Sequence, residues 1–354
     1  MPPPADQRSK LRVAAVQMES ANGMLAKNLE RARSFVEEAA RDRAELILLP
    51  EFLATGYAWT TDIWNAAEPA VGPTVEWLCQ TSSRFQVWLG ASFLEAEGDD
   101  FYNTFVLTAP DGSEAGRVRK QNPALWEAFF FRGQAGPHVI DTALGRIGVG
   151  ICYDNYLAYF PRLMYEQSVD LILMPHSAAS FSEMFPFCRD TIELFQRDLR
   201  ELPAHHAELL GVPVIMSNKC GPWHSGKPGQ PPASFLGSSA IVDSDGTVMQ
   251  QLRGEERVIF ADVTLDPARK RTSPPPSFGR WARKTSFWRN FVCWFPESAG
   301  SLYYRMSPTR RDQARVVSSR SRIGPGGQSN EHRRRRNSTA CVPEMGDGWK
   351  ARGE

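Results

Sequence analysis

The fold is decided by a stretch near the N-terminus, Leu11–Glu51, which reads LRVAAVQMESANGMLAKNLERARSFVEEAARDRAELILLPE. Its first eight residues are mostly apolar and predict a buried strand. Residues 25–44 place apolar or small side chains at helical spacing between charged ones, which predicts an amphipathic helix. The apolar run Leu46–Leu49 is stopped by Pro50 and is typical of a parallel strand covered on both faces. Together these elements predict a right-handed crossover unit.

The rest of the body continues this alternation of strands and helices. Two Asp-Gly pairs, at 111–112 and 245–246, lie between strand-like stretches and predict hairpins. Crossovers combined with hairpins predict one α/β domain with mixed sheets and helices outside, over residues 9–302. Further strands are predicted at 87–93, 104–107, 115–120, 146–151, 171–174, 214–217, 239–242 and 258–263, and further helices at 74–85, 160–167 and 183–210.

Composition excludes several classes of protein. The 354 residues are 42% apolar, which is too rich in core-forming side chains for a chain that is disordered throughout. No run of about 18 apolar residues is present, so no membrane span is expected. The first ten residues lack an apolar secretory segment, and a cytoplasmic location is therefore expected. The six cysteines show no C-x-x-C pairing, and reduced thiols are expected.

Charge and aromatic content set the C-terminal part apart. Residues 303–354 hold 12 Lys and Arg against 5 Asp and Glu, whereas residues 1–302 hold 29 against 35. This tail is rich in Ser, Gly and Arg and is predicted to be disordered. Its four consecutive arginines, Arg333–Arg336, suit RNA, an anionic membrane or an import receptor, but a solvated tail with no specific nucleic acid or membrane partner is expected. The aromatic segment Phe287–Tyr304 predicts an apolar arm, packed either on its own domain or on a second subunit.

Three polar residues follow predicted strands and have complementary chemistry. Glu51 follows Leu-Ile-Leu-Leu-Pro, Lys120 closes Gly-Arg-Val-Arg-Lys, and Cys152 closes Arg-Ile-Gly-Val-Gly-Ile-Cys. The carboxyl ends of parallel strands face the crevice where α/β sheets bind ligands. A thiol is a good nucleophile as thiolate, a carboxylate can take its proton, and an ammonium can stabilise developing negative charge. Taken singly, each residue is as well explained as a surface charge or a small core side chain.

The stretches that carry these residues resemble the signatures of a known family. In order along the chain, Leu48-Leu-Pro-Glu-Phe52, Arg119-Lys-Gln-Asn-Pro123 and Gly148-Val-Gly-Ile-Cys-Tyr-Asp154 are similar to the three signature stretches of the nitrilase superfamily, the carbon-nitrogen hydrolases. The resemblance covers about residues 11–265. It implies a four-layer αββα sandwich and association into homodimers or larger homo-oligomers.

The resemblance also implies roles for individual residues. Glu51 is expected to be the general base, Lys120 the charged stabiliser and Cys152 the nucleophile. Glu127, seven residues after the lysine, matches a second glutamate of many members and is expected to orient Lys120 and the substrate. The expected reaction is hydrolysis of a non-peptide C–N bond through a thioester, with release of ammonia or an amine.

The residues around the nucleophile predict the class of substrate. Cys152-Tyr-Asp-Asn155 is closer to the amidase and carbamoylase branches than to nitrile hydrolysers, so an amide or N-carbamoyl substrate is favoured. Nitrile hydrolysis, acyl transfer to an amine and a non-catalytic binding protein on this fold remain the alternatives. No metal-ligand spacing, phosphate loop or dinucleotide fingerprint is present, and neither a metal nor another cofactor is expected. The residues expected to contact substrate are Tyr57, Trp126, Tyr153 and His176.

Overall fold

The predicted crossover unit is present in the computed structural model, which describes residues 9–180, 189–224, 233–285 and 287–320. Strands β1 (Ser9–Gln17) and β2 (Leu46–Leu48) pair in parallel, and α1 (Leu25–Arg41) connects them. Every residue of β2 is buried, as expected for a central strand with both faces covered. Helix α1 buries a stripe of side chains against the sheet, formed by Asn28, Leu29, Ala32, Val36 and Ala39.

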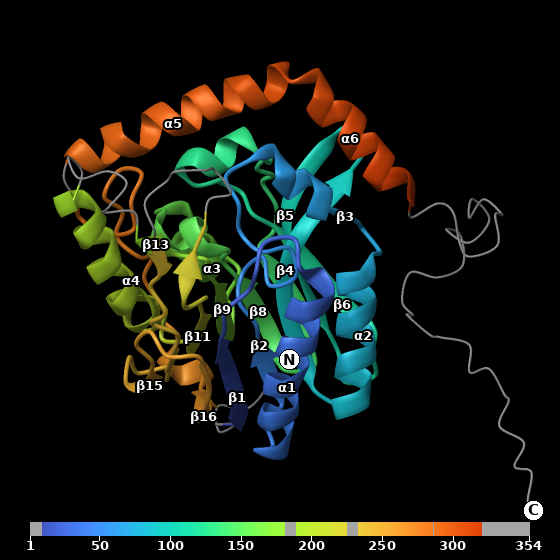
Figure 1. The fold of residues 1–354 in the computed structure, drawn as a ribbon. Coiled ribbons are helices and arrows are strands. Elements are labelled where there is room, and N and C mark those ends of the chain that lie inside the picture. The colour runs from blue at the N-terminus through green and yellow to red at the C-terminus, as the bar shows by residue number, and fades with distance from the viewer. Residues whose placement is uncertain (1–8, 181–188, 225–232, 286, 321–354) are drawn as a thin grey trace, which may run out of the picture.

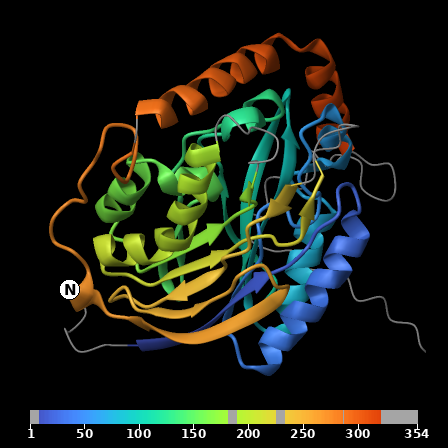
Figure 2. The same cartoon turned by 60° about the vertical axis from the view of Figure 1, so that its left-hand side comes forward.

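Two large sheets are built around this unit (Figures 1 and 2). In the described residues, the first has the order β16-β1-β2-β4-β5-β6, with β3 paired to β4. Its other strands are β3 (Glu68–Pro69), β4 (Trp88–Glu97), β5 (Asp100–Thr108), β6 (Glu114–Arg119) and β16 (Arg257–Leu265). Parallel pairs, β1 with β2 and β2 with β4, occupy the centre, and antiparallel pairs lie on both sides.

The second sheet has the order β15-β14-β11-β9-β8-β7. Its central strands β8, β9 and β11 are parallel, and the outer pairs are antiparallel. These strands are β7 (Val139–Thr142), β8 (Gly145–Val149), β9 (Leu171–Pro175), β11 (Val214–Ser217), β14 (Ala240–Val242) and β15 (Val248–Gln251); a small third sheet contains β10 (Ala179–Ser180), β12 (Pro222–Trp223) and β13 (Ala233–Phe235).

Helices cover the outer faces of the two large sheets. Helices α1 and α2 (Pro73–Phe85) lie on the first, and α3 (Tyr159–Glu166) and α4 (Arg189–Leu210) lie on the second. One apolar cluster fills the space between the sheets, and one lies under each helix layer. The expected four-layer αββα sandwich is therefore confirmed. The predicted helix 183–210 is observed from Arg189, and residues 183–188 lie outside the described part.

Both predicted Asp-Gly hairpins are present. Strands β5 and β6 pair antiparallel around Gly112, and β14 and β15 pair antiparallel around Gly246. These glycines have φ angles of +84° and +88°, in the left-handed region where a residue without Cβ is favoured.

The predicted boundary of the disordered tail at residue 303 is wrong. Helix α5 (Phe287–Met306) continues past it, and α6 (Pro308–Ser319) follows. The two helices run across the top of the molecule in both views (Figures 1 and 2). Tyr304, Arg310 and Val317 are buried against the domain, so the arm packs on its own chain. Residues 321–354 lie outside the described part. Within that part, no helix is long and apolar enough to cross a membrane.

Candidate active site

Three strand ends bring the predicted residues to one place between the sheets. Glu51 follows β2 of the first sheet, and Lys120 follows β6 of the same sheet. Cys152 follows β8 of the second sheet and begins the short 3-10 helix η3 (Cys152–Tyr156). Glu127 lies in another 3-10 helix, η2 (Leu125–Phe129).

Lys120 lies between two carboxylates. Its Nζ is 2.8 Å from Oε1 of Glu51 and 2.7 Å from Oε2 of Glu127. All three side chains are almost fully buried, with at most 1% of each exposed. Burial lowers the pKa of Lys120, but the charges of Glu127 and Glu51 outweigh it and hold that pKa well above its ordinary value. The lysine is therefore an ammonium at neutral pH.

Neutral groups hold both carboxylates in place. The Asn103 amide donates to Glu51 Oε1 at 2.6 Å, and the Tyr57 hydroxyl donates to Glu127 Oε1 at 2.8 Å. The backbone N–H of Ala124 donates to the other oxygen of Glu127 at 2.6 Å. Glu51 Oε2 is buried and has no hydrogen-bond partner among the described residues, so one carboxylate oxygen is left to take a proton.

The thiol of Cys152 is electrostatically coupled to these charged groups. Burial, and then the charge of Glu51, raise the pKa of Cys152 well above its ordinary value, while Lys120 pulls it down. The backbone N–H of Ser177 faces the sulfur and also favours the thiolate. At neutral pH the resting group is a thiol, and a nucleophilic reaction needs a base to remove its proton. Glu51 is the neighbouring carboxylate with a free oxygen.

The backbone at the cysteine is tightly constrained. Cys152 has a φ of +50°, an uncommon left-handed conformation for a residue with a side chain. Asn155 holds the turn, because its amide donates to the carbonyls of Gly150 and Cys152 at 2.7 and 3.1 Å. A Cβ at Gly150 would lie 1.9 Å from the Asn155 side-chain oxygen, which explains a glycine two residues before the thiol.

The four residues expected to contact substrate have different surroundings. The Tyr57 hydroxyl donates to Glu127, and the Tyr57 ring packs in an apolar cluster with Phe52 and Trp59. Trp126 is half-buried in η2 and stacks on Phe129 at a ring separation of 5.5 Å. The Tyr153 ring is buried in the cluster beneath α3 and α4, where it contacts Trp281.

His176 is buried next to the nucleophile loop. The Asn155 amide lies 3.1 Å from its Nε2, and its backbone carbonyl accepts the N–H of Glu51 at 3.2 Å. Burial, reinforced by the charge of Lys120, lowers the pKa of His176 to about 3. The imidazole is therefore neutral.

Several residues that support the site are not predicted from the amino-acid sequence. Asn103 contacts Glu51 and Ser177 contacts Cys152. Neither residue belongs to a sequence motif that would predict its contact. Asp154 accepts the backbone N–H groups of Gln121 and Asn122 at 3.1 and 2.9 Å and so anchors the segment after Lys120. The position of Asp154, two residues after Cys152, is the feature of the sequence that could have predicted this role.

The described residues contain no cluster of three His, Cys, Asp or Glu side chains suited to a metal ion.

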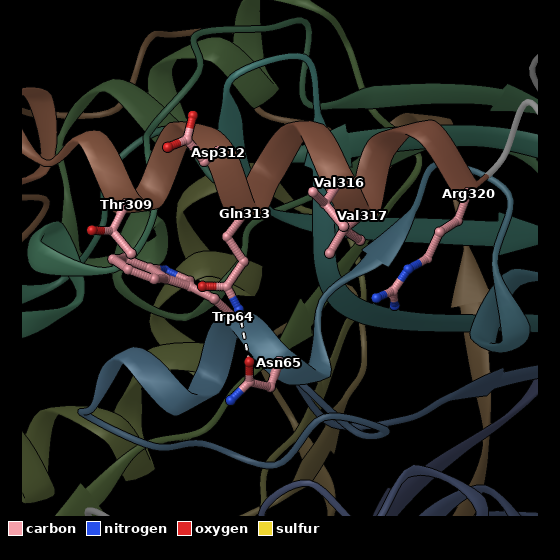
Figure 3. Close-up of a pocket in the computed structure, with 8 residues that line it drawn as sticks. All are labelled: Trp64, Asn65, Thr309, Asp312, Gln313, Val316, Val317 and Arg320. Atoms are coloured by element: carbon pink, nitrogen blue, oxygen red, sulfur yellow. Dashed lines mark hydrogen bonds between the residues drawn. The ribbon is translucent and has the colours of Figure 1, made fainter.

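A groove of about 400 Å³ lies elsewhere, between α6 and the 3-10 helix η1 (Thr61–Ala66) (Figure 3). Trp64 forms its floor, and Gln313 donates to Asn65 across it at 2.7 Å. None of the four predicted catalytic side chains lines this groove.

Comparisons with known proteins agree with the site. The family model for carbon-nitrogen hydrolases matches residues 12–271. An N-carbamoylputrescine amidase of Oryza sativa is 28% identical over 269 residues, covering 73% of this chain and 87% of the relative. A citrullinase of Francisella tularensis is 27% identical over 263 residues, covering 72% and 88%. The crystal structure of a carbon-nitrogen hydrolase from Helicobacter pylori G27 superposes with a TM-score of 0.65 at 21% identity, covering 73% and 90%.

The matched range includes the stretches around Glu51, Lys120 and Cys152 and spans most of the chain. The solved neighbour has the same fold as the four-layer sandwich described above. The chain therefore belongs to the carbon-nitrogen hydrolase family of the nitrilase superfamily and is an enzyme that acts on non-peptide C–N bonds.

Proposed function

We propose that this protein hydrolyses an amide or N-carbamoyl C–N bond through a thioester on Cys152. The observation that carries the proposal is a buried ammonium, Lys120, held between two carboxylates and acting electrostatically on the half-buried thiol of Cys152. Such a site can remove a thiol proton and stabilise an oxyanion without a metal. Two relatives named for N-carbamoylputrescine and for citrulline support a carbamoyl or amide substrate over a nitrile.

The first half of the reaction forms the thioester. Glu51 accepts the proton of Cys152 as the sulfur attacks the carbonyl carbon. The oxyanion is stabilised by Lys120 and by the backbone N–H of Tyr153. Glu51 then gives its proton to the leaving nitrogen, the C–N bond breaks, and ammonia or an amine departs.

The second half returns the enzyme to its starting state. Glu51 takes a proton from water as the water oxygen attacks the thioester carbon. The C–S bond breaks, and the proton held by Glu51 returns to the sulfur. Glu127 contacts Lys120 rather than the thiol, and its role is to hold the ammonium in place. Tyr57, Trp126, Tyr153 and His176 are proposed to line the substrate pocket.

The test is a panel of amides and N-carbamoyl amines, each mixed with the full chain and followed by intact mass spectrometry and by product release. The expected result is turnover with a transient acyl adduct mapped to Cys152, and no turnover by Cys152→Ala. Turnover by Cys152→Ala would overturn the assignment of the nucleophile.

The same experiment separates the alternatives. Each nitrile is assayed beside its amide, and a nitrilase would convert the nitrile faster. Product analysis with an added amine reports acyl transfer, because a transferase would form mainly the N-acyl amine, whereas a hydrolase would still form mainly the acid. A non-catalytic binding protein would show neither turnover nor alkylation of Cys152 by iodoacetamide.

Assembly and location complete the proposal. We infer a homodimer or larger homo-oligomer in the cytoplasm, and membership of the superfamily supports the first. Light scattering of the full chain measures the first, and a single monomer mass at micromolar concentration would contradict it.

A further inference from the structure

A second buried lysine lies close to the general base. Lys219 follows β11 and is 0% exposed. Its Nζ donates to the backbone carbonyl of Phe52 at 2.9 Å and lies 5.4 Å from the centre of the Phe235 ring. It makes no ion pair with a carboxylate of the described residues. A buried cation without a paired anion is costly, so a specific function is needed to explain it.

The carbonyl that Lys219 binds belongs to the residue directly after Glu51. Phe52 has a φ of +49°, a conformation that a bulky aromatic residue rarely adopts. A strained backbone persists where its surroundings hold it in place. The Glu51–Phe52 turn therefore needs anchors on both residues.

Five hydrogen bonds anchor this turn. On Glu51, the N–H donates to the carbonyl of His176 at 3.2 Å, and the carbonyl accepts the Ser177 hydroxyl at 2.8 Å. On Phe52, the N–H donates to the Ser92 hydroxyl at 2.9 Å, and the carbonyl accepts both the Lys219 ammonium and the N–H of Gly56, the latter at 3.1 Å. Lys219 supplies the one charge-assisted bond of the five, and such bonds are about twice as strong as neutral ones.

Glu51 is the charged group that acts electrostatically on Lys219. Burial lowers the pKa of Lys219 to about 7, and the charge of Glu51 opposes that fall. The other groups packed around it are uncharged. Met18, just after β1, forms an isolated β-bridge with Lys219. The N–H of Gly237 donates to the Lys219 carbonyl at 3.0 Å, and the Phe235 ring lies over the Lys219 ammonium.

We propose that Lys219 is a positioning residue for the reaction: its ammonium fixes the strained turn after β2 and thereby aims the Glu51 carboxylate at Lys120 and Cys152. This rests on the proposed role of Glu51 as general base. Because the ammonium deprotonates near neutral pH, the anchor weakens as the pH rises above about 7. The turnover rate is then expected to fall in the same range.

The test compares Lys219→Met and Lys219→Arg with the wild-type chain in steady-state kinetics from pH 5.5 to 9. Loss of one charge-assisted hydrogen bond corresponds to about ten- to a hundred-fold, so Lys219→Met is expected to lose about that factor in kcat, with a smaller change in KM. Lys219→Arg keeps its charge at every pH and is expected to retain activity and to lose the decline above pH 7.

Lys270→Met is the matched control. Lys270 also donates to a backbone carbonyl, that of Ser168, at 2.9 Å, but its ion pair is with Asp170, and neither contact involves a proposed catalytic residue. This variant is expected to keep the wild-type rate and pH profile.

Three outcomes would overturn the proposal. They are an unchanged kcat in Lys219→Met, an equal loss in Lys219→Met and Lys219→Arg with both folded, or an alkaline decline that Lys219→Arg retains. If Lys219→Met fails to fold, the comparison of wild type with Lys219→Arg decides. Failure of the proposed function is recognised separately, because wild type would then form no Cys152 adduct.

Discussion

At the scale of single residues, Lys120 is the cation that two buried carboxylates share. Lys120→Ala removes a charged contact at the oxyanion, and the loss of one such donor commonly costs about 10²–10³ in turnover. It also leaves Glu51 and Glu127 facing each other without a counterion. Breaking a buried pair costs about 3–5 kcal/mol, so this variant is expected to be destabilised as well as inactive. Urea unfolding at pH 8 and steady-state kinetics measure the two effects.

The double variant Lys120→Ala/Glu127→Gln is the control for that prediction. It removes one of the two uncompensated charges and is expected to regain part of the lost stability while staying inactive. A double variant less stable than Lys120→Ala would contradict the account of Lys120 as the shared counterion.

Tyr57 is predicted to contact substrate, and its hydroxyl donates to Glu127 at 2.8 Å. Tyr57→Phe is expected to lower kcat by about tenfold, which equals about 1.4 kcal/mol, because Glu127 and with it Lys120 become less firmly held. KM is expected to change less. Tyr165→Phe is the matched control, since Tyr165 donates to the Thr272 carbonyl at 2.9 Å in a solvent-exposed hydrogen bond that involves none of the proposed catalytic residues. A rise in KM alone would instead indicate a direct substrate contact.

At the scale of elements, the arm formed by α5 packs on the 3-10 helix that carries Glu127. Gly300 of α5 lies against Ala128 and Phe129, and a Cβ there would be 2.6 Å from Phe129 Cδ2 and 2.9 Å from the Ala128 carbonyl carbon. The inner face of the arm therefore supports a catalytic element, although it comes from the end of the described chain. Its outer face exposes Trp294 and Phe295, which are 59% and 61% accessible.

Gly300→Ala tests this contact. Alanine normally stabilises a helix by about 1 kcal/mol over glycine, but overpacking costs about 1–3 kcal/mol because the backbone of η2 cannot move without displacing Glu127. The variant is expected to be less stable than wild type and to lose turnover. Thermal unfolding and kcat are measured beside Gly254→Ala, where a Cβ meets no atom within 4 Å and little change is expected. Equal behaviour of the two variants would argue against the contact.

At the scale of the whole molecule, buried histidines make global stability depend on pH. His206 in α4 is 0% exposed, and burial, with the charge of His205 second, lowers its pKa to about 3 from the ordinary 6.5. Between these values the unfolded chain binds a proton that the folded chain does not. This group therefore leaves the free energy of unfolding unchanged above pH 6.5 and lowers it as the pH falls from 6.5 towards 3, by up to about 1.4 kcal/mol per pH unit.

His206→Leu is expected to flatten the pH dependence of the free energy of unfolding by about that slope between pH 6 and pH 4. Urea unfolding at four pH values measures it. The exposed His224 provides the control, and His224→Gln is expected to leave the slope unchanged. A wild-type slope in His206→Leu would mean that other groups carry the acid sensitivity.

The amino-acid sequence by itself determined an α/β domain with mixed sheets, and its resemblance to the nitrilase superfamily implied the four-layer sandwich and the candidate catalytic residues. The strand ending at Leu48 is recognisable because periodicity and an apolar run act over a few neighbouring residues. Glu51, Lys120 and Cys152 are recognisable because each follows such a strand within a short signature. Composition alone gives the wrong boundary for the disordered tail. The polar, basic residues 303–319 are helical because a few of their side chains are buried against the domain. Tyr304 accepts the N–H of Phe101 at 2.8 Å, and Ala314 and Val317 pack on the domain.

Tertiary structure alone decided which groups hold the catalytic residues. Asn103 meets Glu51, Tyr57 meets Glu127, and Lys219 meets the turn after Glu51, across 52, 70 and 167 positions of the chain. No local pattern marks these pairs, because a hydrogen bond between distant segments depends on how two sheets and their loops pack. Short stretches of sequence thus determine which reactive side chains the site contains, and the packing of the two sheets determines their geometry.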